Sequence, residues 1–303
     1  MKDSRLKTSL LKIWFRIQNK RTVKRLRRSD SFFIMSTVDT INYIKKHGCS
    51  ISRYGDGEFQ LMQQCGAPGF QSGSSEMSEA LLNVLTNHSP DLLICMPGPM
   101  ISSKHLRKSG KAFWEGWIPE NYANIISMVK SRTGSQYHFG DSYISRPYSA
   151  YRSNQHTSTL FRQVRELWES QDILIIEGTH SRLGVGNDLF SNTKSIKRIL
   201  APAENAFSVY PQILDSVLSH WNGELVIMAL GPTATVLASD LSKKGIQALD
   251  IGHIDEQYEW FKSGTPFQPI ANKYVNEAIG GNTLVEYTDP IYESQIIDKI
   301  ELP

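Results

Sequence analysis

The feature of this sequence that most constrains its fold is a repeated alternation of short continuous apolar runs with helical stretches. The apolar runs cover residues 91–96, 172–178 and 224–231, and each ends at or close to a glycine. None of them alternates apolar with polar residues, as a half-exposed strand would. Such runs are typical of strands that are covered on both faces, as in a parallel sheet.

Helical patterns lie around and between these runs. Helices are expected at about residues 36–47, 76–87, 111–130, 158–170, 188–200, 211–220 and 233–244. A short strand before Asp56 and a last strand at residues 246–251, just after Gly245, complete the alternation. The pattern predicts an α/β fold with a single Rossmann-like, open, mainly parallel sheet flanked by helices. Ligands of such sheets bind at the carboxyl ends of the strands, where the glycine-rich and charged motifs of this chain fall.

Composition describes a globular chain. It has 303 residues, 40% of them apolar, and a mean hydropathy of -0.32. No run approaches the roughly 20 apolar residues that span a bilayer. The three cysteines, Cys49, Cys65 and Cys95, are odd in number and lack Cys-x-x-Cys spacing. This usage argues against a disulfide framework or a zinc site and predicts a cytoplasmic protein.

Positive charge is concentrated at the N-terminus. Residues 1–28 contain 11 of the 33 Lys and Arg residues but one of the 30 Asp and Glu residues. Apolar residues recur there at helical spacing, at Leu6, Leu10, Ile13, Trp14 and Ile17. We therefore divide the chain into a basic amphipathic extension, residues 1–35, and a Rossmann-like domain, residues 36–303.

Three interpretations of the basic extension stay open at this point. It can lie on an anionic membrane at the inner face of the cell, bind an acidic partner, or be a solvated tail. Nucleic acid is not expected as a partner, because the rest of the chain has neither a basic stripe nor an interleaved aromatic platform.

Two carboxylates follow the first short strand. The segment from Arg53 to Glu58 reads Arg-Tyr-Gly-Asp-Gly-Glu. Continued strand alternation would point Asp56 and Glu58 to the same side, and the glycines would let a bulky ligand approach the backbone. Two hard oxygen ligands at a strand end suit Mg²⁺ or Mn²⁺ carrying a diphosphate. The alternative is an ordinary polar turn.

A glycine-rich segment follows the strand at residues 172–178. It contains Arg182, Gly184, Gly186, Asn187 and Asp188. A leucine stands where the third glycine of a dinucleotide fingerprint belongs, so binding of NAD is weakly supported. Arg182 is expected to pair with a phosphate, and glycine amides before the helix predicted at 188–200 are expected to cradle it. Asn187 or Asp188 could instead cap that helix, the interpretation favoured for Asp188.

Three further groups of residues have both a structural and a functional interpretation. Gly231, Thr233 and Thr235 open a predicted helix, with hydroxyls and amides that would also suit a phosphate or ribose. His253 follows a glycine at the end of the last strand. If a helix starts near Asp255, Asp255 and Glu259 lie on one of its faces. One of the two carboxylates could then act as a general base, or both could form a solvated acidic face. The loop with aromatic and basic residues could line a sugar site or lie on the surface; it holds Tyr143, Arg146, Tyr148, Tyr151 and Arg152.

Taken together, four segments resemble the GT-D-type bacterial glycosyltransferases, known from glycosylation of serine-rich-repeat adhesins and from surface-polysaccharide loci. The segments are residues 53–58, 181–190, 230–237 and 250–261, and the resemblance covers roughly residues 36–280. Each segment is short, but their shared order is specific. The basic extension and the residues after 281 are not part of the pattern.

The resemblance implies a Rossmann-like domain with an Asp-x-Glu metal motif, Asp56 and Glu58, that binds Mn²⁺ or Mg²⁺ with a UDP-hexose. The hexose would pass to a glycan, glycoprotein or lipid-linked acceptor in surface-glycan assembly. Glu259 is the expected general base and Asp255 the alternative. The expected donor contacts are Arg53, Arg182, Gly184, Gly186, Asn187, Gly231, Thr233, Thr235 and His253.

Three other functions remain open from the residues alone. A metal-dependent phosphohydrolase of nucleotides or sugar phosphates would use the same carboxylates, with water replacing the acceptor. A non-catalytic nucleotide-sugar-binding subunit, held at the membrane by the extension, would bind UDP without turnover. An NAD oxidoreductase is the weakest alternative, because no acidic ribose partner follows the glycines at the usual spacing.

Overall fold

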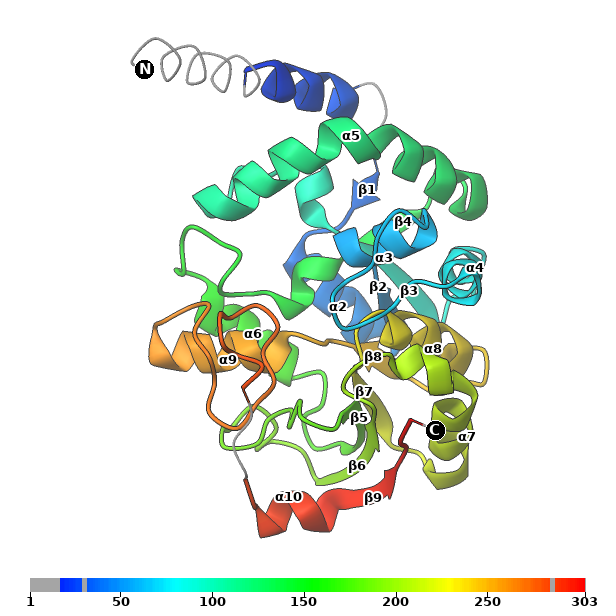
Figure 1. Cartoon of the computed structure of the whole chain (residues 1–303), viewed down its shortest axis with the longest axis vertical. Coiled ribbons are helices and arrows are strands. Elements are labelled where there is room, and N and C mark those ends of the chain that lie inside the picture. Colours follow the sequence, from blue (N-terminus) through cyan, green and yellow to red (C-terminus); the bar gives the residue numbers. More distant parts are fainter. Residues whose placement is uncertain (1–16, 29–31, 284–286, 303) are drawn as a thin grey trace.

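The computed structural model describes residues 17–28, 32–283 and 287–302 (Figure 1). Within them, nine strands form one open sheet in the order β1-β4-β3-β2-β8-β7-β5-β6-β9, and every neighbouring pair is parallel. The predicted fold class, an open parallel sheet flanked by helices, is confirmed. The predicted apolar helical positions before Ile17 lie outside the described residues.

The strands are short, and the longest are in the second half of the chain. They are β1 (Phe33–Ile34), β2 (Ser50–Arg53), β3 (Leu92–Met96), β4 (His138–Asp141), β5 (Asp172–Gly178), β6 (Ser195–Ala201), β7 (Leu225–Ala229), β8 (Ala248–Asp250) and β9 (Ile296–Lys299). All three continuous apolar runs became strands, β3, β5 and β7, as predicted.

Helices connect most of these strands. The α-helices are α2 (Thr37–His47), α3 (Asp56–Met62), α4 (Ser75–Val84), α5 (Lys108–Thr133), α6 (Thr157–Arg165), α7 (Tyr210–His220), α8 (Pro232–Ser242), α9 (Ile254–Ser263) and α10 (Pro290–Gln295). Short 3₁₀ helices are η1 (Gly98–Met100), η2 (Ser142–Ser145) and η3 (Ala206–Val209). A further helix covers residues 17–28 and lies over α5, at the opposite end of the molecule from α10 and β9 (Figure 1). No described helix is long and apolar enough to cross a membrane.

The central strands are buried on both faces, which explains their continuous apolar sequences. In β5, Ile173 and Ile175 face one hydrophobic cluster, whereas Leu174 and Ile176 face another. The first cluster includes side chains of α2, α6 and α9, and the second includes side chains of α7 and α8. A third cluster packs α3, α4 and α5 against β3. Each strand therefore carries apolar residues toward both helical layers.

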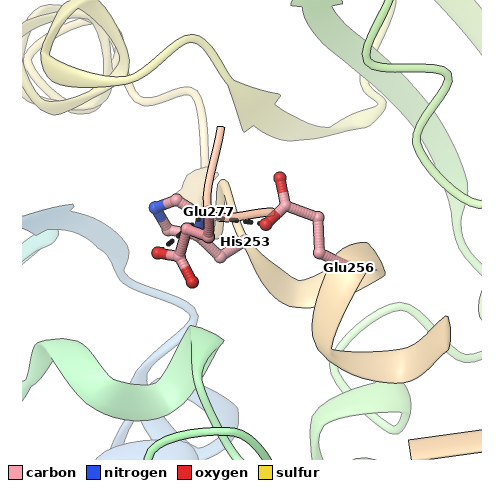
Figure 2. A group of neighbouring side chains, drawn as sticks. All are labelled: His253, Glu256 and Glu277. Carbon is pink, nitrogen blue, oxygen red and sulfur yellow. Dashed lines mark hydrogen bonds and ion pairs between the residues drawn. The ribbon is translucent and has the colours of Figure 1, made fainter. Parts of the chain in front are cut away.

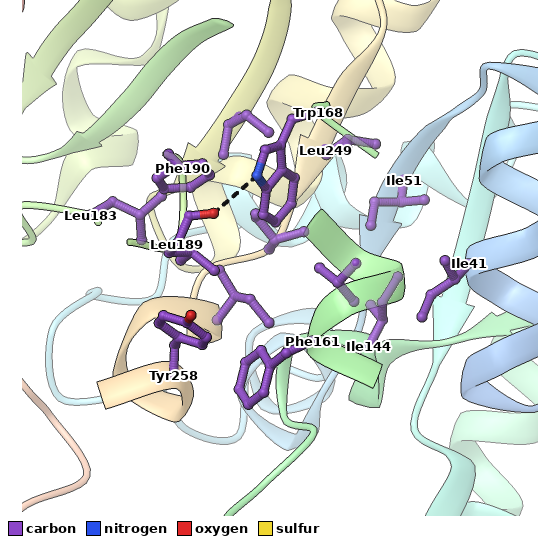
Figure 3. Close-up of a cluster of buried hydrophobic side chains, with 14 of the residues drawn as sticks. Ile41, Ile51, Ile144, Phe161, Trp168, Leu183, Leu189, Phe190, Leu249 and Tyr258 are labelled. Atoms are coloured by element: carbon purple, nitrogen blue, oxygen red, sulfur yellow. Dashed lines mark hydrogen bonds between the residues drawn. The ribbon is translucent and has the colours of Figure 1, made fainter. Parts of the chain in front are cut away.

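The largest cluster also orders the segment that follows β5. Trp168 is fully buried, and its indole Nε1 donates a hydrogen bond to the carbonyl oxygen of Leu189 at 3.2 Å (Figure 3). Phe190 lies against the same indole, with ring centroids 5.0 Å apart. These contacts hold the irregular segment of residues 179–194 against the sheet.

The helix predicted at residues 188–200 is wrong. Residues 188–194 form turns, and residues 195–201 form β6, between β5 and the short strand β9. The first three residues of β6, Ser195 to Lys197, are exposed or half-buried, and the arginine that follows them, Arg198, is buried. The mixture of polar and apolar residues in β6 therefore resembles an amphipathic helix, while the pairing partners that make it a strand are distant in sequence.

Candidate functional site

A pocket of about 630 Å³ lies at the carboxyl ends of the strands. Residues that follow β2, β5, β7 and β8 line it, among them Asp56, Gly178, Gly231 and His253. Side chains of α5 and of the loop after β4 complete the wall. The pocket therefore lies where ligands of open parallel sheets bind, as the sequence predicted.

Asp56 and Glu58 both line this pocket, but not as extensions of a strand. β2 ends at Arg53, and Asp56 begins α3, so the predicted strand alternation is wrong. Glu58 turns back to accept a hydrogen bond from the backbone N–H of Gly55 at 2.7 Å. Carboxylates are favoured in the first turn of a helix because free amides and the helix dipole stabilise them. Burial nevertheless raises the pKa of Glu58 to about 7.

Arg53 connects the two strands beneath the pocket. Its guanidinium donates to Asp250 at 2.8 Å through Nη2 and to the Asp250 carbonyl at 2.6 Å through Nε. Thr235 is fully buried, and its hydroxyl donates to the Arg53 carbonyl at 2.9 Å. These bonds join β2, β8 and α8. Arg53 borders the pocket, whereas the Thr235 hydroxyl is directed into the fold, and nucleotide contacts by either residue stay predictions.

The start of α8 forms another part of the wall. Gly231 lines the pocket at φ +52°, and a Cβ atom there would overlap the ring of Phe70. Thr233 is fully buried and lies 3.5 Å from the side-chain oxygen of Gln71. The Thr233 hydroxyl therefore contributes to packing, while the glycine permits the close approach of two chain segments.

A cluster of His253, Glu256 and Glu277 projects from α9 and the segment after it into the pocket (Figure 2). His253 Nδ1 lies 3.4 Å from Glu256 Oε2 and 3.7 Å from Glu277 Oε1. One potential ligand atom of each residue lies within 4.8 Å of the others, a spacing that could hold a metal ion. Arg146 forms an ion pair with the same Glu277 oxygen.

The electrostatics of this cluster differ between its two carboxyl groups. Burial raises the pKa of Glu256. Burial also acts to raise the pKa of Glu277, but Arg146 and His253 outweigh it and hold that pKa below its ordinary value. The Glu277 Oε2 atom is buried, and no described residue forms a hydrogen bond with it. An ionised carboxylate with one free oxygen therefore borders the pocket.

Asp255 and Glu259 share one face of α9, as predicted, and both contact Lys273. Lys273 Nζ lies 2.7 Å from Asp255 Oδ2 and 3.1 Å from Glu259 Oε1. Asn187 donates to both carboxylates at 2.7 Å. Burial acts to lower the pKa of Lys273, but the two carboxylates outweigh it and raise that pKa. Asp255 lines the large pocket, whereas Glu259 lines a smaller hollow of about 310 Å³.

The glycine-rich segment after β5 borders both spaces: Ser181 and Leu183 line the large pocket, whereas Arg182 and Gly186 line the small hollow. Turns and bends follow Gly186 up to β6, so the described residues have no helix start directly after this glycine, where one was predicted. The Arg182 side chain donates to the Asn272 carbonyl and lies over the Tyr287 ring, 5.1 Å from its centroid. Arg182, a predicted phosphate contact, therefore lines the small hollow, whereas Asp56 lines the large pocket.

One role assigned to this segment needs correction, and one of its glycines has a steric role. The predicted N-cap role of Asp188 is wrong, because residues 188–194 form turns. Its carboxylate instead accepts from the hydroxyl of Tyr258 at 3.0 Å. Gly184 is required sterically, since it has φ +74° and a Cβ atom there would overlap the Phe190 ring.

Some side chains of the loop after β4 line the large pocket, and others are buried in the hydrophobic core. Tyr143 and Arg146 line the pocket, and the Tyr143 hydroxyl accepts from Trp114 Nε1 at 2.8 Å. Tyr148 is buried in the largest hydrophobic cluster. The structure thus brings Arg146 together with His253, a pairing that the sequence did not predict.

Sequence reasoning missed Glu256, Glu277 and Lys273 as residues of the site. Glu256 follows His253 by three positions, so helical spacing could have connected them once α9 was placed. Glu277 and Lys273 lie in an irregular segment beyond α9, where no periodic signal indicates what they contact.

Comparisons with known proteins agree with this geometry. The family described as "Glycosyltransferase GT-D fold" matches residues 51–278. A solved structure described as a domain of unknown function 1792 with a distinct glycosyltransferase fold superposes with a TM-score of 0.84 and 32% identity, covering 93% of this chain and 100% of that one. A glycosyltransferase with the same domain from Streptococcus sanguinis gives a TM-score of 0.82 and 31% identity, covering 89% of this chain and 100% of that one.

Two curated relatives are longer than this chain. The probable glycosyl transferase Gly of Streptococcus gordonii is 34% identical over 266 residues, which are 87% of this chain and 38% of that protein. The glycosyltransferase GlyD of Streptococcus pneumoniae is 32% identical over 264 residues, 86% of this chain and 32% of that protein. The chain thus spans about a third of these relatives' lengths. With the family match, the fold and the pocket in agreement, the chain belongs to the GT-D glycosyltransferase family.

Proposed function

We propose that this chain is a metal-dependent hexosyltransferase that uses a UDP-sugar and a glycan, glycoprotein or lipid-linked acceptor. One observation carries the proposal. Asp56 and Glu58 border a pocket at the carboxyl ends of the strands in a chain of a glycosyltransferase family. The pocket volume of about 630 Å³ is of the size that holds a small-molecule ligand.

The donor set of Asp56 and Glu58 fits a hard divalent cation. Both residues offer carboxylate oxygens to one pocket, and Glu58 is a half-buried carboxyl whose raised pKa reflects missing compensation for its charge. Oxygen ligands favour Mg²⁺ or Mn²⁺. When bound, such an ion supplies Lewis-acid stabilisation of the charge that develops on a diphosphate leaving group.

The cluster of His253, Glu256 and Glu277 is the second place where a cation fits. Its charge argues against it as the resident site, because the Arg146 guanidinium already pairs with Glu277 and would repel a divalent ion. We therefore keep the cation at Asp56 and propose that His253 contacts the nucleotide or its phosphates. Electron paramagnetic resonance of bound Mn²⁺ separates the two sites. Asp56→Asn should abolish high-affinity binding, and His253→Ala should retain it; the reverse result would move the site.

The other chain groups have proposed roles that follow from their positions. Arg53 and Gly231 border the large pocket and would face the donor. Arg182 and Gly186 line the small hollow, Gly184 lies between them in the sequence, and Asn187 donates to Asp255, which lines the large pocket; contacts of these four residues with the donor remain proposals. Thr233 and Thr235 are buried, which supports a packing role for their hydroxyls.

The proposed general base is one of the two carboxylates held by Lys273. A general base needs a carboxylate placed where it can reach the acceptor hydroxyl. The sequence favoured Glu259, but Asp255 is the one that lines the large pocket. This placement supports Asp255, with Glu259 as the alternative. Asp255→Asn should lower turnover of a bound donor without abolishing metal-dependent UDP binding, whereas Glu259→Gln should have the smaller effect.

A turnover screen tests the function as a whole. The full chain is incubated with a panel of UDP-hexoses and saccharide, peptide and lipid-linked acceptors, with Mn²⁺ or with EDTA, and both released UDP and glycosylated acceptor are measured. Transfer with Mn²⁺ should disappear with EDTA and in Asp56→Asn, and should persist in Asp215→Asn, a matched change at an exposed position on α7. Free hexose without glycosylated acceptor for every acceptor class would instead support a hydrolase.

A further inference from the structure

The helix at residues 17–28 carries an unbroken row of cations along one face. Residues 20, 21, 24, 25 and 28 are exposed and recur at the spacing of one helical face. They are Lys20, Arg21, Lys24, Arg25 and Arg28. Ile17, at the start of the same row, is 46% exposed. We call the five cationic residues the basic face.

The opposite face attaches the helix to the folded domain. Val23 is buried, and Leu26 packs against the cluster that contains the α5 side chains. Arg27 donates to the backbone carbonyl oxygen of Met100 at 3.0 Å and also to that of Pro99. The helix is therefore docked over α5 (Figure 1), and this docking fixes which of its faces is exposed.

The charge of the basic face is not neutralised by the fold. Within residues 17–28, 32–283 and 287–302, no carboxylate forms an ion pair with any of its five cations. Five like charges on adjacent turns repel one another, so an isolated helix gains nothing from this arrangement. A planar surface of negative charge would complement all five at once.

The apolar neighbours of the basic face indicate which anionic surface it fits. Ile17 is exposed in line with the cations, and the preceding sequence places Leu10, Ile13 and Trp14 at helical spacing with it. Cations beside apolar and aromatic residues are typical of helices that lie in a lipid headgroup layer. The phosphates of a nucleic acid would pair with the cations but would not bury the exposed isoleucine. We infer that the basic face docks the chain on a bilayer that contains anionic phospholipid.

This docking places the pocket close to the basic helix. The carbonyls that bind Arg27 belong to η1, which directly follows Pro97, and both Pro97 and part of α5 line the large pocket. The membrane-facing helix therefore lies beside a wall of the pocket. If the proposed transferase function holds, on which this step rests, the arrangement favours a lipid-linked acceptor over a soluble one.

Vesicle sedimentation of the full chain tests the inference. Binding is measured to phosphatidylcholine vesicles and to vesicles that also contain phosphatidylglycerol, at low and high salt. The variant Lys20→Glu/Lys24→Glu reverses two charges of the basic face. Lys46→Glu/Lys244→Glu is the matched control, since both of its lysines are exposed elsewhere on the domain and the net charge changes equally. Circular dichroism confirms that each variant is folded.

The expected result is binding that requires phosphatidylglycerol and weakens with salt. The basic-face variant should bind about thirtyfold or more weakly, because each cation near such a surface contributes roughly fivefold in affinity. The control should keep its binding. Equal loss in both variants, equal binding to both vesicle types, or preference for a duplex oligonucleotide or polyglutamate over the vesicles would overturn the inference. UDP titration of the same variants reports separately on the transferase site, so failure of one proposal does not mimic failure of the other.

Discussion

Replacing Glu58 with glutamine should change how stability depends on pH. Burial raises the pKa of this carboxyl from its ordinary 4.5 to about 7 in the folded chain. The folded state therefore holds the proton more tightly than the unfolded state. This contribution is fully present below about pH 4.5 and is lost as the pH rises through about 7.

The size of the effect follows from the two pKa values. Each pKa unit corresponds to 1.36 kcal/mol, so the difference between 4.5 and about 7 gives about 3 kcal/mol. Glu58 is only half-buried, and screening by water in the pocket reduces the expected value to about 2 kcal/mol. Glutamine keeps an oxygen that can accept from the Gly55 amide but does not ionise. Glu58→Gln should therefore gain about 2 kcal/mol relative to the wild type between about pH 4.5 and pH 8.

Urea unfolding monitored by circular dichroism measures this difference at about pH 5 and about pH 8. Glu79→Gln, at an exposed position of α4, is the control and should show the same difference from wild type at both pH values. Saturating Mn²⁺ should stabilise the wild type more at the higher pH, because an ion that binds carboxylate releases the proton. A Glu58→Gln difference that is constant with pH would refute the reasoning.

Two further perturbations test the packing around the site. Lys273→Met should cost about 3 kcal/mol of unfolding free energy, because Asp255 is buried and would lose its ammonium partner. Adding Asp255→Asn to Lys273→Met should restore more than half of that free energy. Failure of the second substitution to restore it would show that the two residues are not coupled. Gly184→Ala should cost about 2 kcal/mol or more in urea unfolding, since its φ of +74° and the Phe190 ring leave no room for Cβ. Gly186→Ala shares the positive φ but meets open space, so an equal cost at both positions would contradict the steric account.

The central strands β3, β5 and β7 could be predicted because their burial on both faces requires continuous runs of apolar residues, which are visible in the local sequence. β3 and β7 are apolar throughout, and β5 is apolar from Ile173 to Ile176, since helices cover both faces of the sheet. β6 could not be predicted in the same way. It begins exposed near the edge of the sheet, and a buried arginine, Arg198, is tolerated in it because Glu177 of β5 lies 2.6 Å away. That partner is apparent only after the two strands are paired.

The position of the candidate site could be predicted from the sequence, but the hydrogen bonds and ion pairs between its residues could not. Strand ends followed by glycine and acidic residues located the pocket, because parallel strands bring all their carboxyl ends to one edge. The turn of Glu58 back to the Gly55 amide depends on α3 beginning at Asp56, which the strand alternation expected here did not include. The partners Lys273 and Glu277 lie in an irregular segment, so only tertiary structure connects them with α9.

The measurement that tests the central claim most directly is calorimetric titration of the full chain with UDP, with and without Mn²⁺. It is repeated on the double variant Asp56→Asn/Glu58→Gln, with Asp215→Asn as the control. The account predicts UDP binding that requires Mn²⁺, is lost in the double variant and is retained in the control. Metal-independent binding, or binding that the double variant keeps, would contradict a cation-dependent donor site at Asp56 and Glu58.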